Sequence, residues 1–267
     1  MLQKNWSSET YNRLLKTISS KQGVAAFDFD NTIVYNDFGE EVMNSLIKEG
    51  LPFFKEDFTL FFKDNELSKS IFQNRFLNPK LFSEFILQSY TEIASSEGVE
   101  TSYRWSSFLF SGSTEKELKE YSKKVWTEQK KRVDQNRVFP YDEMLDLIQF
   151  LLEKNWEVYI VTASPSYVIQ AISEELGIQQ EMVIGMELEE KNGFLSPKIL
   201  EPYTYGLGKV KAFQNKTGKL PDLAMGDSWN DFPLLESATL SIALDKGNKD
   251  FINKCKERNF LIQKRFI

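Results

Sequence analysis

Residues 24–32 read Val-Ala-Ala-Phe-Asp28-Phe-Asp30-Asn31-Thr32, an apolar run that ends in two carboxylates one residue apart. A short apolar run of this kind predicts a buried strand, and the two carboxylates then follow its carboxyl end. In open α/β sheets, ligands bind at that end of the strands. Such a carboxylate pair can bind Mg²⁺, supply an oxygen nucleophile and leave a second carboxyl free to move protons.

The composition limits the kind of protein that this chain can be. It has 267 residues, of which 41% are apolar, enough for one large domain or two modest ones. A formal net charge of −6 and a pI near 5.1 give no basic field that would attract nucleic acid. No stretch approaches a membrane span, and residues 1–21 lack the apolar region of a signal peptide. We therefore expect a soluble, cytoplasmic protein that binds neither nucleic acid nor membranes.

Two residue counts exclude whole classes of chemistry. Cys255 is the single cysteine, so an intrachain disulfide is impossible, and we expect Cys255 to be a tail residue of no consequence. The chain has no histidine, which excludes Ser-His-Asp and Cys-His nucleophile systems and zinc sites that contain histidine. Acid–base chemistry must therefore come from Asp, Glu, Lys or Tyr, and a site of carboxylates and magnesium is compatible with this composition.

The spacing of apolar residues predicts an alternation of strands and helices that is interrupted once. Helices are expected over 8–20, 41–48, 79–94, 114–132, 141–154, 166–176, 209–216 and 229–236. Strands are expected over 24–29, 157–162, 182–188, 223–226 and 240–244, and Asn192-Gly193 predicts a hairpin turn. The alternation predicts an α/β fold with a doubly wound, mostly parallel, Rossmann-like sheet. We expect residues 1–36 and 139–267 to form this core, and 37–138 to form an inserted all-α cap.

The strand over 157–162 leads into a helix through Thr162 and Ala163. A hydroxyl and the backbone amides at a helix N-terminus suit the oxygens of a phosphate group. The alternative is an ordinary N-cap, with Ser164 capping and Pro165 in the first helical position. We favour phosphate binding for Thr162 and capping for Ser164.

A lysine at the start of the next predicted helix is a candidate cation for the same site. Lys209 follows Gly208, and a glycine there would allow the ammonium to turn inward. The ammonium could then neutralise a phosphate group and a nucleophile together. Lys211 is a competing candidate, and we favour Lys209.

A second pair of carboxylates follows another predicted strand. The strand over 223–226 delivers Asp227 to the same edge of the sheet, and Asp231 follows one helical turn later. Mg²⁺ prefers oxygen ligands, so Asp28, Asp227 and Asp231 are the candidate metal ligands.

Four segments have been singled out, and they contain, in chain order, Asp28, Thr162, Lys209 and Asp227. In this order they resemble the four motifs of the haloacid dehalogenase superfamily of phosphohydrolases, and the predicted helical insertion resembles the cap of that superfamily. Phe-Asp28-Phe-Asp30-Asn31-Thr32, Val-Thr162-Ala-Ser164 and Gly208-Lys209-Val resemble the phosphoserine phosphatase branch. That branch has relatives that act on phosphocholine or phosphoethanolamine. The resemblance therefore implies Mg²⁺-dependent hydrolysis of a small phosphomonoester of one of these types.

The resemblance also implies a role for each residue. Asp28 would be the nucleophile, forming an aspartyl-phosphate, and a Mg²⁺ ligand. Asp30 would be the general acid and base and would give its carbonyl oxygen to the metal. Thr162 and Lys209 would hold the phosphoryl group. Asp227 would ligate Mg²⁺. Asp231 would support the site, either as a further Mg²⁺ ligand or by contacting the residues that bind the ion.

The predicted cap offers hints about the substrate. Asp37 lies nine residues after Asp28, where the phosphoserine phosphatase branch has an acid that contacts an amino group; the alternative is a helix-capping aspartate. Arg75 and Arg104 are weak candidates for binding a substrate carboxylate. The cap is rich in aromatic residues, which could hold a quaternary ammonium group or, as we favour, build the cap's own core. These residues are Phe53, Phe54, Phe61, Phe62, Tyr103, Trp105, Phe108, Phe110 and Trp126.

Three other functions share parts of this pattern. A phosphotransferase would pass the phosphoryl group to an alcohol, and the four motifs do not separate it from a phosphatase. A signalling phospho-acceptor needs a long-lived acyl phosphate. A base such as Asp30 argues against this function, because it would shorten the lifetime of the acyl phosphate. A non-catalytic module that binds Mg²⁺ and phosphate does not need the full set of residues. The sequence leaves the physiological substrate and the oligomeric state open.

Overall fold

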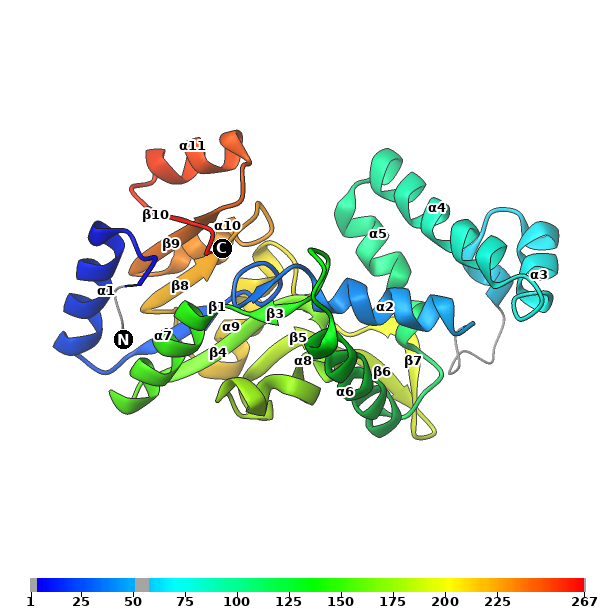
Figure 1. Cartoon of the computed structure of the whole chain (residues 1–267), viewed down its shortest axis with the longest axis horizontal. Helices are drawn as coiled ribbons and strands as arrows, with labels where there is room; N and C mark the ends of the chain where they lie inside the picture. The colour runs from blue at the N-terminus through cyan, green and yellow to red at the C-terminus, as the bar shows by residue number, and fades with distance from the viewer. Residues whose placement is uncertain (1–3, 51–57, 267) are drawn as a thin grey trace.

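The computed structural model describes residues 4–50 and 58–266, with a parallel sheet at its centre (Figure 1). The strand order is β10-β9-β8-β1-β4-β5, and all neighbours are parallel. The strands are β1 (Val24–Phe27), β4 (Glu157–Pro165), β5 (Val183–Met186), β8 (Leu223–Gly226), β9 (Leu240–Asp245) and β10 (Leu261–Lys264). The chain runs from β1 out to β5 and returns to β8 on the other side of β1. The predicted α/β, doubly wound sheet is confirmed, and β1 lies where the strand order reverses, the usual position of a ligand site.

Buried side chains alternate between the two faces of this sheet. Ala25 and Phe27 belong to one apolar cluster, whereas Val24 and Ala26 belong to the other, as the strand pleat requires. The first cluster includes residues of α1 (Ser8–Ser20), α7 (Asp142–Glu153) and α8 (Ser166–Ser173). The second includes residues of α9 (Leu207–Thr217), α10 (Phe232–Ser237) and α11 (Lys249–Glu257). Helices therefore cover both faces of the sheet with apolar contacts. A polar site that is open to a ligand is then expected at the ends of the strands.

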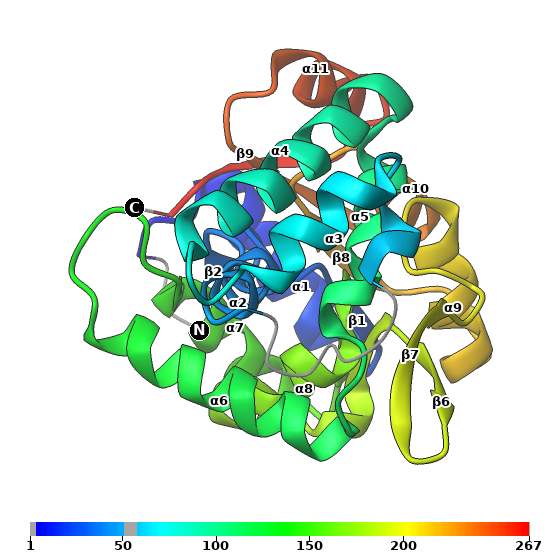
Figure 2. The ribbon, with the colours of Figure 1, turned by 90° about the vertical axis from the view of Figure 1, so that its right-hand side faces the viewer.

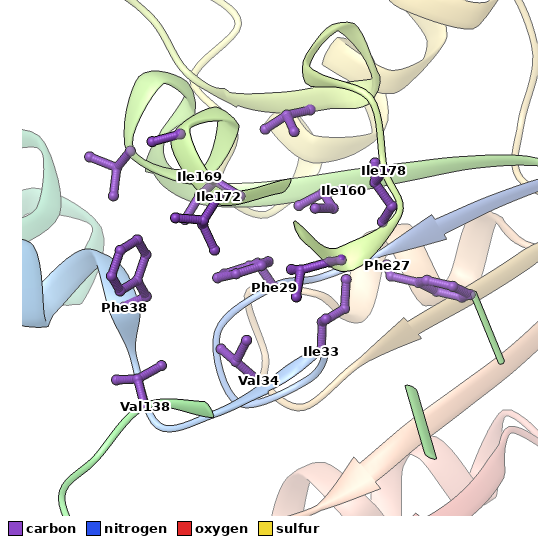
Figure 3. Close-up of a cluster of buried hydrophobic side chains, with 14 of the residues drawn as sticks. Phe27, Phe29, Ile33, Val34, Phe38, Val138, Ile160, Ile169, Ile172 and Ile178 are labelled. Atoms are coloured by element: carbon purple, nitrogen blue, oxygen red, sulfur yellow. The ribbon is translucent and has the colours of Figure 1, made fainter. Parts of the chain in front are cut away.

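The chain turns sharply after β1, which ends two residues before the predicted boundary. The Phe29 carbonyl accepts hydrogen bonds from the amides of residues 32–34, at 3.2, 2.9 and 3.2 Å. Figure 3 shows the Phe29 ring inside the apolar cluster beneath this turn, and the ring is fully buried. Asp28 and Asp30, on either side of Phe29, line a cavity instead. This turn therefore aims both carboxylates at one space.

The segment between β1 and β4 is mostly helical, as predicted. Its helices are α2 (Phe38–Lys48), α3 (Asn65–Gln73), α4 (Pro79–Glu97), α5 (Val99–Ser106) and α6 (Glu115–Lys131), with 3₁₀ turns at Phe58–Phe61 and Ser107–Phe110. The sequence did not predict α3 and α5, because both are short and largely polar. Figure 1 shows α3, α4 and α5 standing apart from the sheet, whereas α6 packs along α8 (Figure 2). The cap boundaries at 37 and 138 stay a prediction.

Two short strands carry the chain into and out of this helical segment. β2 (Val34–Tyr35) pairs antiparallel with β3 (Phe139–Pro140), and the rings of Tyr35 and Phe139 stack with centroids 5.1 Å apart. Phe38 follows β2 and Val138 precedes β3, and Figure 3 shows both side chains in one apolar cluster. The segment that enters the helical insertion and the segment that leaves it therefore form one two-stranded ribbon. The predicted hairpin around Asn192-Gly193 is also present, as β6 (Leu188–Lys191) and β7 (Phe194–Ile199).

The end of the chain corrects one expectation. Cys255 is fully buried on α11 and packs in the same cluster as Phe251 and Ile252, so it is a core residue and not an inconsequential tail. We missed α11 and β10 because their few apolar residues are spread through a highly charged segment. Within the described residues, no helix is both long enough and apolar enough to cross a membrane.

Candidate active site

A cavity of about 350 Å³ lies at the carboxyl ends of β1, β4 and β8, between the sheet and helices α2, α4 and α5. One side, here called the core wall, carries Asp28, Asp30, Thr162 and Asp227. The opposite side, here called the cap wall, carries Asp37, Glu40, Tyr90 and Tyr103. Ala163 also lines the cavity. Six of the eight predicted site residues therefore line one cavity, although they lie far apart along the chain. Lys209 and Asp231 do not line it, but Lys209 contacts both Asp28 and Asp231.

Asp28 is held by contacts to both of its carboxylate oxygens. The ammonium of Lys209 lies 2.6 Å from Oδ1, and the Thr32 hydroxyl donates to Oδ2 at 3.0 Å. Burial and the charge of Asp231 raise the pKa of Asp28 well above its usual range, and Lys209 opposes this shift. The contact with Lys209 therefore favours the ionised form that a nucleophile needs.

Lys209 is the predicted cation, and its side chain is fully buried. Its ammonium also lies 2.6 Å from Asp231 Oδ1, so it bridges Asp28 and Asp231. Burial alone would lower the pKa of Lys209, but the two carboxylates outweigh it and raise the pKa. The competing Lys211 is exposed. Gly208 allows this arrangement, because a Cβ there would lie 1.7 Å from the Tyr203 carbonyl oxygen.

Asp30 is held by the segment that enters the helical insertion. Its Oδ1 accepts the Phe38 amide at 2.7 Å, and its Oδ2 accepts the Ser164 hydroxyl at 2.8 Å. Burial raises the pKa of Asp30, while the bonds from Ser164 and Phe38 oppose the rise. A carboxyl group with a raised pKa can serve as a general acid. Gly39 permits the close approach, since a Cβ there would lie 2.2 Å from Ser164 Oγ.

The contact between Ser164 and Asp30 corrects a prediction. Ser164 does not cap the following helix, because β4 continues to Pro165 and α8 begins at Ser166 without a side-chain cap. Thr162, which the same segment provides, is buried and accepts the Ser164 amide at 3.1 Å. Among the described residues the Thr162 hydroxyl donates no hydrogen bond, so its proton can be donated to a ligand in the cavity.

Three buried carboxylates lie close enough to hold one metal ion. Asp28, Asp227 and Asp231 each offer an oxygen, and the three oxygens lie within 4.8 Å of one another. Burial and Asp231 raise the pKa of Asp227 to about 6, which a bound cation would counteract. Because Mg²⁺ prefers carboxylate oxygens, this donor set fits that ion.

Asp231 differs from the other two carboxylates in its contacts. Its Oδ1 faces Lys209, and its Oδ2 accepts the Asp227 amide, the Ser228 amide and the Ser228 hydroxyl, at 3.1, 3.1 and 2.8 Å. Four donors therefore occupy this carboxylate. Asp231 holds both Lys209 and the loop that carries Asp227.

Lys246 is a site residue that the sequence analysis missed. It lines the cavity and forms an ion pair with Asp227 Oδ2. Lys246 directly follows β9, so the rule that points to strand ends would have found it. Glu40 and Tyr90 were also missed, since a helix surface gives no comparable signal.

Asp37 is a helix cap, which was one interpretation of its sequence position, and its contact with a substrate amino group stays a prediction. Its Oδ1 accepts the Glu40 amide at 2.7 Å and caps α2, and the residue also lines the cavity. The two arginine candidates do not reach this cavity. Arg75 donates to the carbonyls of Gly50 and Phe72, and Arg104 pairs with Glu100 and Glu201. Neither arginine is free to bind a substrate carboxylate there.

Most aromatic residues of the insertion pack against one another, as we favoured. The rings of Phe61 and Phe108 stack with centroids 4.2 Å apart, and Phe62 meets Trp105 at 5.5 Å. Trp126 packs against Phe38. Tyr103 and Phe110 also line the cavity, although Tyr103 stacks with Tyr90 and Phe110 belongs to the buried apolar cluster. Phe53 and Phe54 lie outside the described residues.

This fold and site define an α/β protein that gathers carboxylates, a buried lysine and a threonine at the reversal point of a parallel sheet. The family model for haloacid dehalogenase-like hydrolases matches residues 25–236, so the chain belongs to that family. The resemblance stated from the four motifs is confirmed.

Individual relatives agree with this assignment. Phosphoserine phosphatase from Archaeoglobus fulgidus is 32% identical over 105 residues, which span 38% of this chain and 30% of that protein. A conserved protein of unknown function from Anaerococcus prevotii has a similar structure, with a TM-score of 0.74 and 19% identity over 97% of this chain and 92% of the other. A phosphoserine phosphatase bound as a phospho-aspartyl intermediate analogue gives a TM-score of 0.54 and 19% identity, over 92% and 95%. At these identities, the structural matches establish the fold.

Proposed function

We propose that this protein is a Mg²⁺-dependent phosphatase that hydrolyses a small phosphomonoester through an aspartyl-phosphate. One observation carries the proposal: Asp28, held by Lys209 and Thr32, faces the same cavity as Asp30, whose pKa is raised. This arrangement supports a mechanism in which Asp28 acts in its ionised form as the nucleophile while Asp30 acts in its protonated form as the acid. We also propose that residues 37–138 act as the cap of this site.

The first chemical step transfers the phosphoryl group to the protein. A carboxylate oxygen of Asp28 attacks phosphorus in line, and the bond from phosphorus to the ester oxygen breaks. Protonated Asp30 gives its proton to the departing oxygen, so the product leaves as an alcohol. Thr162 and Lys209 hold the phosphoryl oxygens during this step, since phosphoryl transfer depends mainly on positioning and charge stabilisation.

The second step returns the protein to its starting state. Asp30, now ionised, takes a proton from a water molecule that attacks phosphorus. The bond between phosphorus and Asp28 breaks, and inorganic phosphate is released. When bound by Asp28, Asp227 and, as the resemblance implies, the Asp30 carbonyl, Mg²⁺ would supply the positive charge that offsets repulsion between carboxylates and phosphate. We assign Asp231 the supporting role, because its oxygens already accept four hydrogen bonds.

The direct test is a phosphatase assay with p-nitrophenyl phosphate and a panel of natural phosphomonoesters. We expect release of inorganic phosphate with Mg²⁺, loss of activity with a chelator, and recovery when Mg²⁺ is restored. Mg²⁺ binding without turnover of any ester would show a non-catalytic module. Transfer of the phosphoryl group to an added alcohol, with no inorganic phosphate, would show a phosphotransferase.

A further inference from the structure

The two walls of the cavity differ in how their negative charges are balanced. On the core wall, Asp28 contacts Lys209 and Asp227 pairs with Lys246. On the cap wall, Asp37 and Glu40 both project from the start of α2. Lys246 is the single cationic residue that lines the cavity in the described part of the chain, and its ion pair is with Asp227. The cap wall therefore has two acids and no cation of its own.

The carboxylate of Asp37 is open to a ligand. Its Oδ1 caps α2 through the Glu40 amide, and among residues 4–50 and 58–266 no donor is bonded to its Oδ2. Burial, followed by the charges of Asp30 and Glu40, raises the pKa of Asp37 well above its usual range. Burial and Asp30 also raise the pKa of Glu40, and the charge of Lys246, which forms no ion pair with Glu40 among the described residues, only partly opposes this rise. These shifts are expected for acids whose positive partner arrives with a ligand.

Aromatic rings surround these two acids. The Tyr90 hydroxyl helps to lower the pKa of Glu40, and the rings of Tyr90 and Tyr103 lie almost parallel, with centroids 6.3 Å apart. Tyr205 meets Tyr103 edge-on at 6.1 Å, and all three tyrosines line the cavity. Carboxylates together with aromatic faces attract ammonium groups, including quaternary ones.

Among the described residues, the same wall has neither an arginine nor a lysine to receive a carboxylate. Arginine is the usual partner for a carboxylate because its planar group can donate two parallel hydrogen bonds. No arginine lines the cavity in the described residues, and Arg75 and Arg104 are engaged elsewhere. A carboxylate on the substrate would therefore add a third negative charge beside Asp37 and Glu40.

We propose that the alcohol part of the substrate carries an ammonium group and no carboxylate, as in phosphoethanolamine or phosphocholine. This inference rests on the proposed phosphatase function. The phosphate lies against the core wall, and the ammonium group lies against Asp37, Glu40 and the tyrosines of the cap wall. Phosphoserine, which has both an ammonium group and a carboxylate, is a poorer substrate.

The test compares charged substrates with neutral substrates of the same shape. We would measure kcat/KM with Mg²⁺ for phosphoethanolamine against propyl phosphate, and for phosphocholine against dimethylbutyl phosphate, its uncharged carbon analogue. We expect each ammonium ester to exceed its neutral partner by about 10- to 100-fold, in line with charge-assisted contacts. We expect phosphoserine to fall below phosphoethanolamine by about tenfold or more. The two pairs also show whether a primary or a quaternary ammonium group is preferred.

Variants then tie this preference to the cap wall. Asp37→Asn keeps the capping acceptor and removes the charge, and Glu40→Gln removes the second charge. We expect either change to reduce the ratio of charged to neutral kcat/KM by about tenfold, mainly through KM. Glu41→Gln is the matched control, because Glu41 follows Glu40 on α2 but pairs with Arg132 outside the cavity. We expect it to leave the ratio at the wild-type value.

Each remaining outcome has a definite meaning. Equal rates for charged and neutral partners, a preference for phosphoserine, or an unchanged ratio in both Asp37→Asn and Glu40→Gln would overturn this inference. In those cases, turnover of p-nitrophenyl phosphate would leave the proposed function standing. Absence of Mg²⁺-dependent turnover for every ester tested, p-nitrophenyl phosphate included, would overturn both.

Discussion

The core wall and the cap wall of the cavity treat negative charge in opposite ways. On the core wall, Asp28 and Asp231 share the buried ammonium of Lys209, and further donors complete their contacts. On the cap wall, Asp37 and Glu40 stand together without a contacting cation in the described residues. Carboxylates that contact a lysine of the chain form a preassembled site, whereas carboxylates without such a contact are open to a cationic ligand. The first kind should support catalysis and stability, and the second should determine selectivity at a cost in stability.

The largest expected effect is the loss of the nucleophile from the core wall. Asp28→Asn keeps the shape of the side chain but removes the attacking carboxylate, so we expect kcat to fall by about 10⁴-fold or more. The measurement is release of inorganic phosphate, together with a search by mass spectrometry for phosphate attached to Asp28 in the wild type. A folded Asp28→Asn variant with nearly wild-type turnover would contradict the proposed mechanism.

The next effect concerns the balance of charge on the core wall. Lys209→Met would leave Asp28 and Asp231 buried without their shared cation, so we expect the metal-free protein to lose about 3–5 kcal/mol of unfolding free energy. Denaturant unfolding without Mg²⁺ measures this loss. Lys211→Met on the same helix is the control, since Lys211 is exposed, and we expect little change. Equal stability of the two variants would show that Lys209 does not hold the core wall together.

A smaller effect concerns the hydrogen bond that Asp30 receives on the core wall. Ser164 donates to Asp30 and so lowers the pKa of this acid, which means that Ser164→Ala should raise it. The acidic form of Asp30 then persists to higher pH, and the basic form appears only at higher pH. Whichever step limits turnover, the affected limb of the pH–rate profile should move upward by about one pH unit. A downward shift, or an unchanged profile, would remove Ser164 from the control of Asp30.

The smallest expected effect has the opposite sign to that of Lys209→Met. The pKa of Asp37 is raised in the folded state, so the folded protein holds this proton more tightly than the unfolded chain does. Folding stability should therefore decrease as the pH rises above 3.8, the ordinary pKa of the group, until Asp37 is ionised in the folded state as well. Asp37→Asn removes this penalty, and we expect a gain of up to about 1 kcal/mol at neutral pH. Thermal unfolding of the variant and the wild type at several pH values measures the gain, and a clear loss of stability would contradict this account of the cap wall.

The sequence predicted the core wall well because its residues follow strands. The apolar runs before Asp28, Thr162 and Asp227 marked buried strands, and parallel strands end at one edge of a sheet. The order of the four motifs then gave the family. Local rules failed where a polar residue lay outside such a run, as with Glu40 and Tyr90 on the helices of the cap wall.

By itself, then, the sequence determined the sheet, the carboxylates at its edge and the class of chemistry, since apolar periodicity and strand ends are local properties. Only the tertiary structure decided which partner each side chain has. Ser164 contacts Asp30 across 134 residues, and Lys209 contacts Asp28 across 181. It also removed Arg75 and Arg104 from the site and left Asp37 beside Glu40 without a contacting cation in the described chain. Pairing and charge balance depend on distances through space, which packing sets and which the spacing of residues along a chain does not encode.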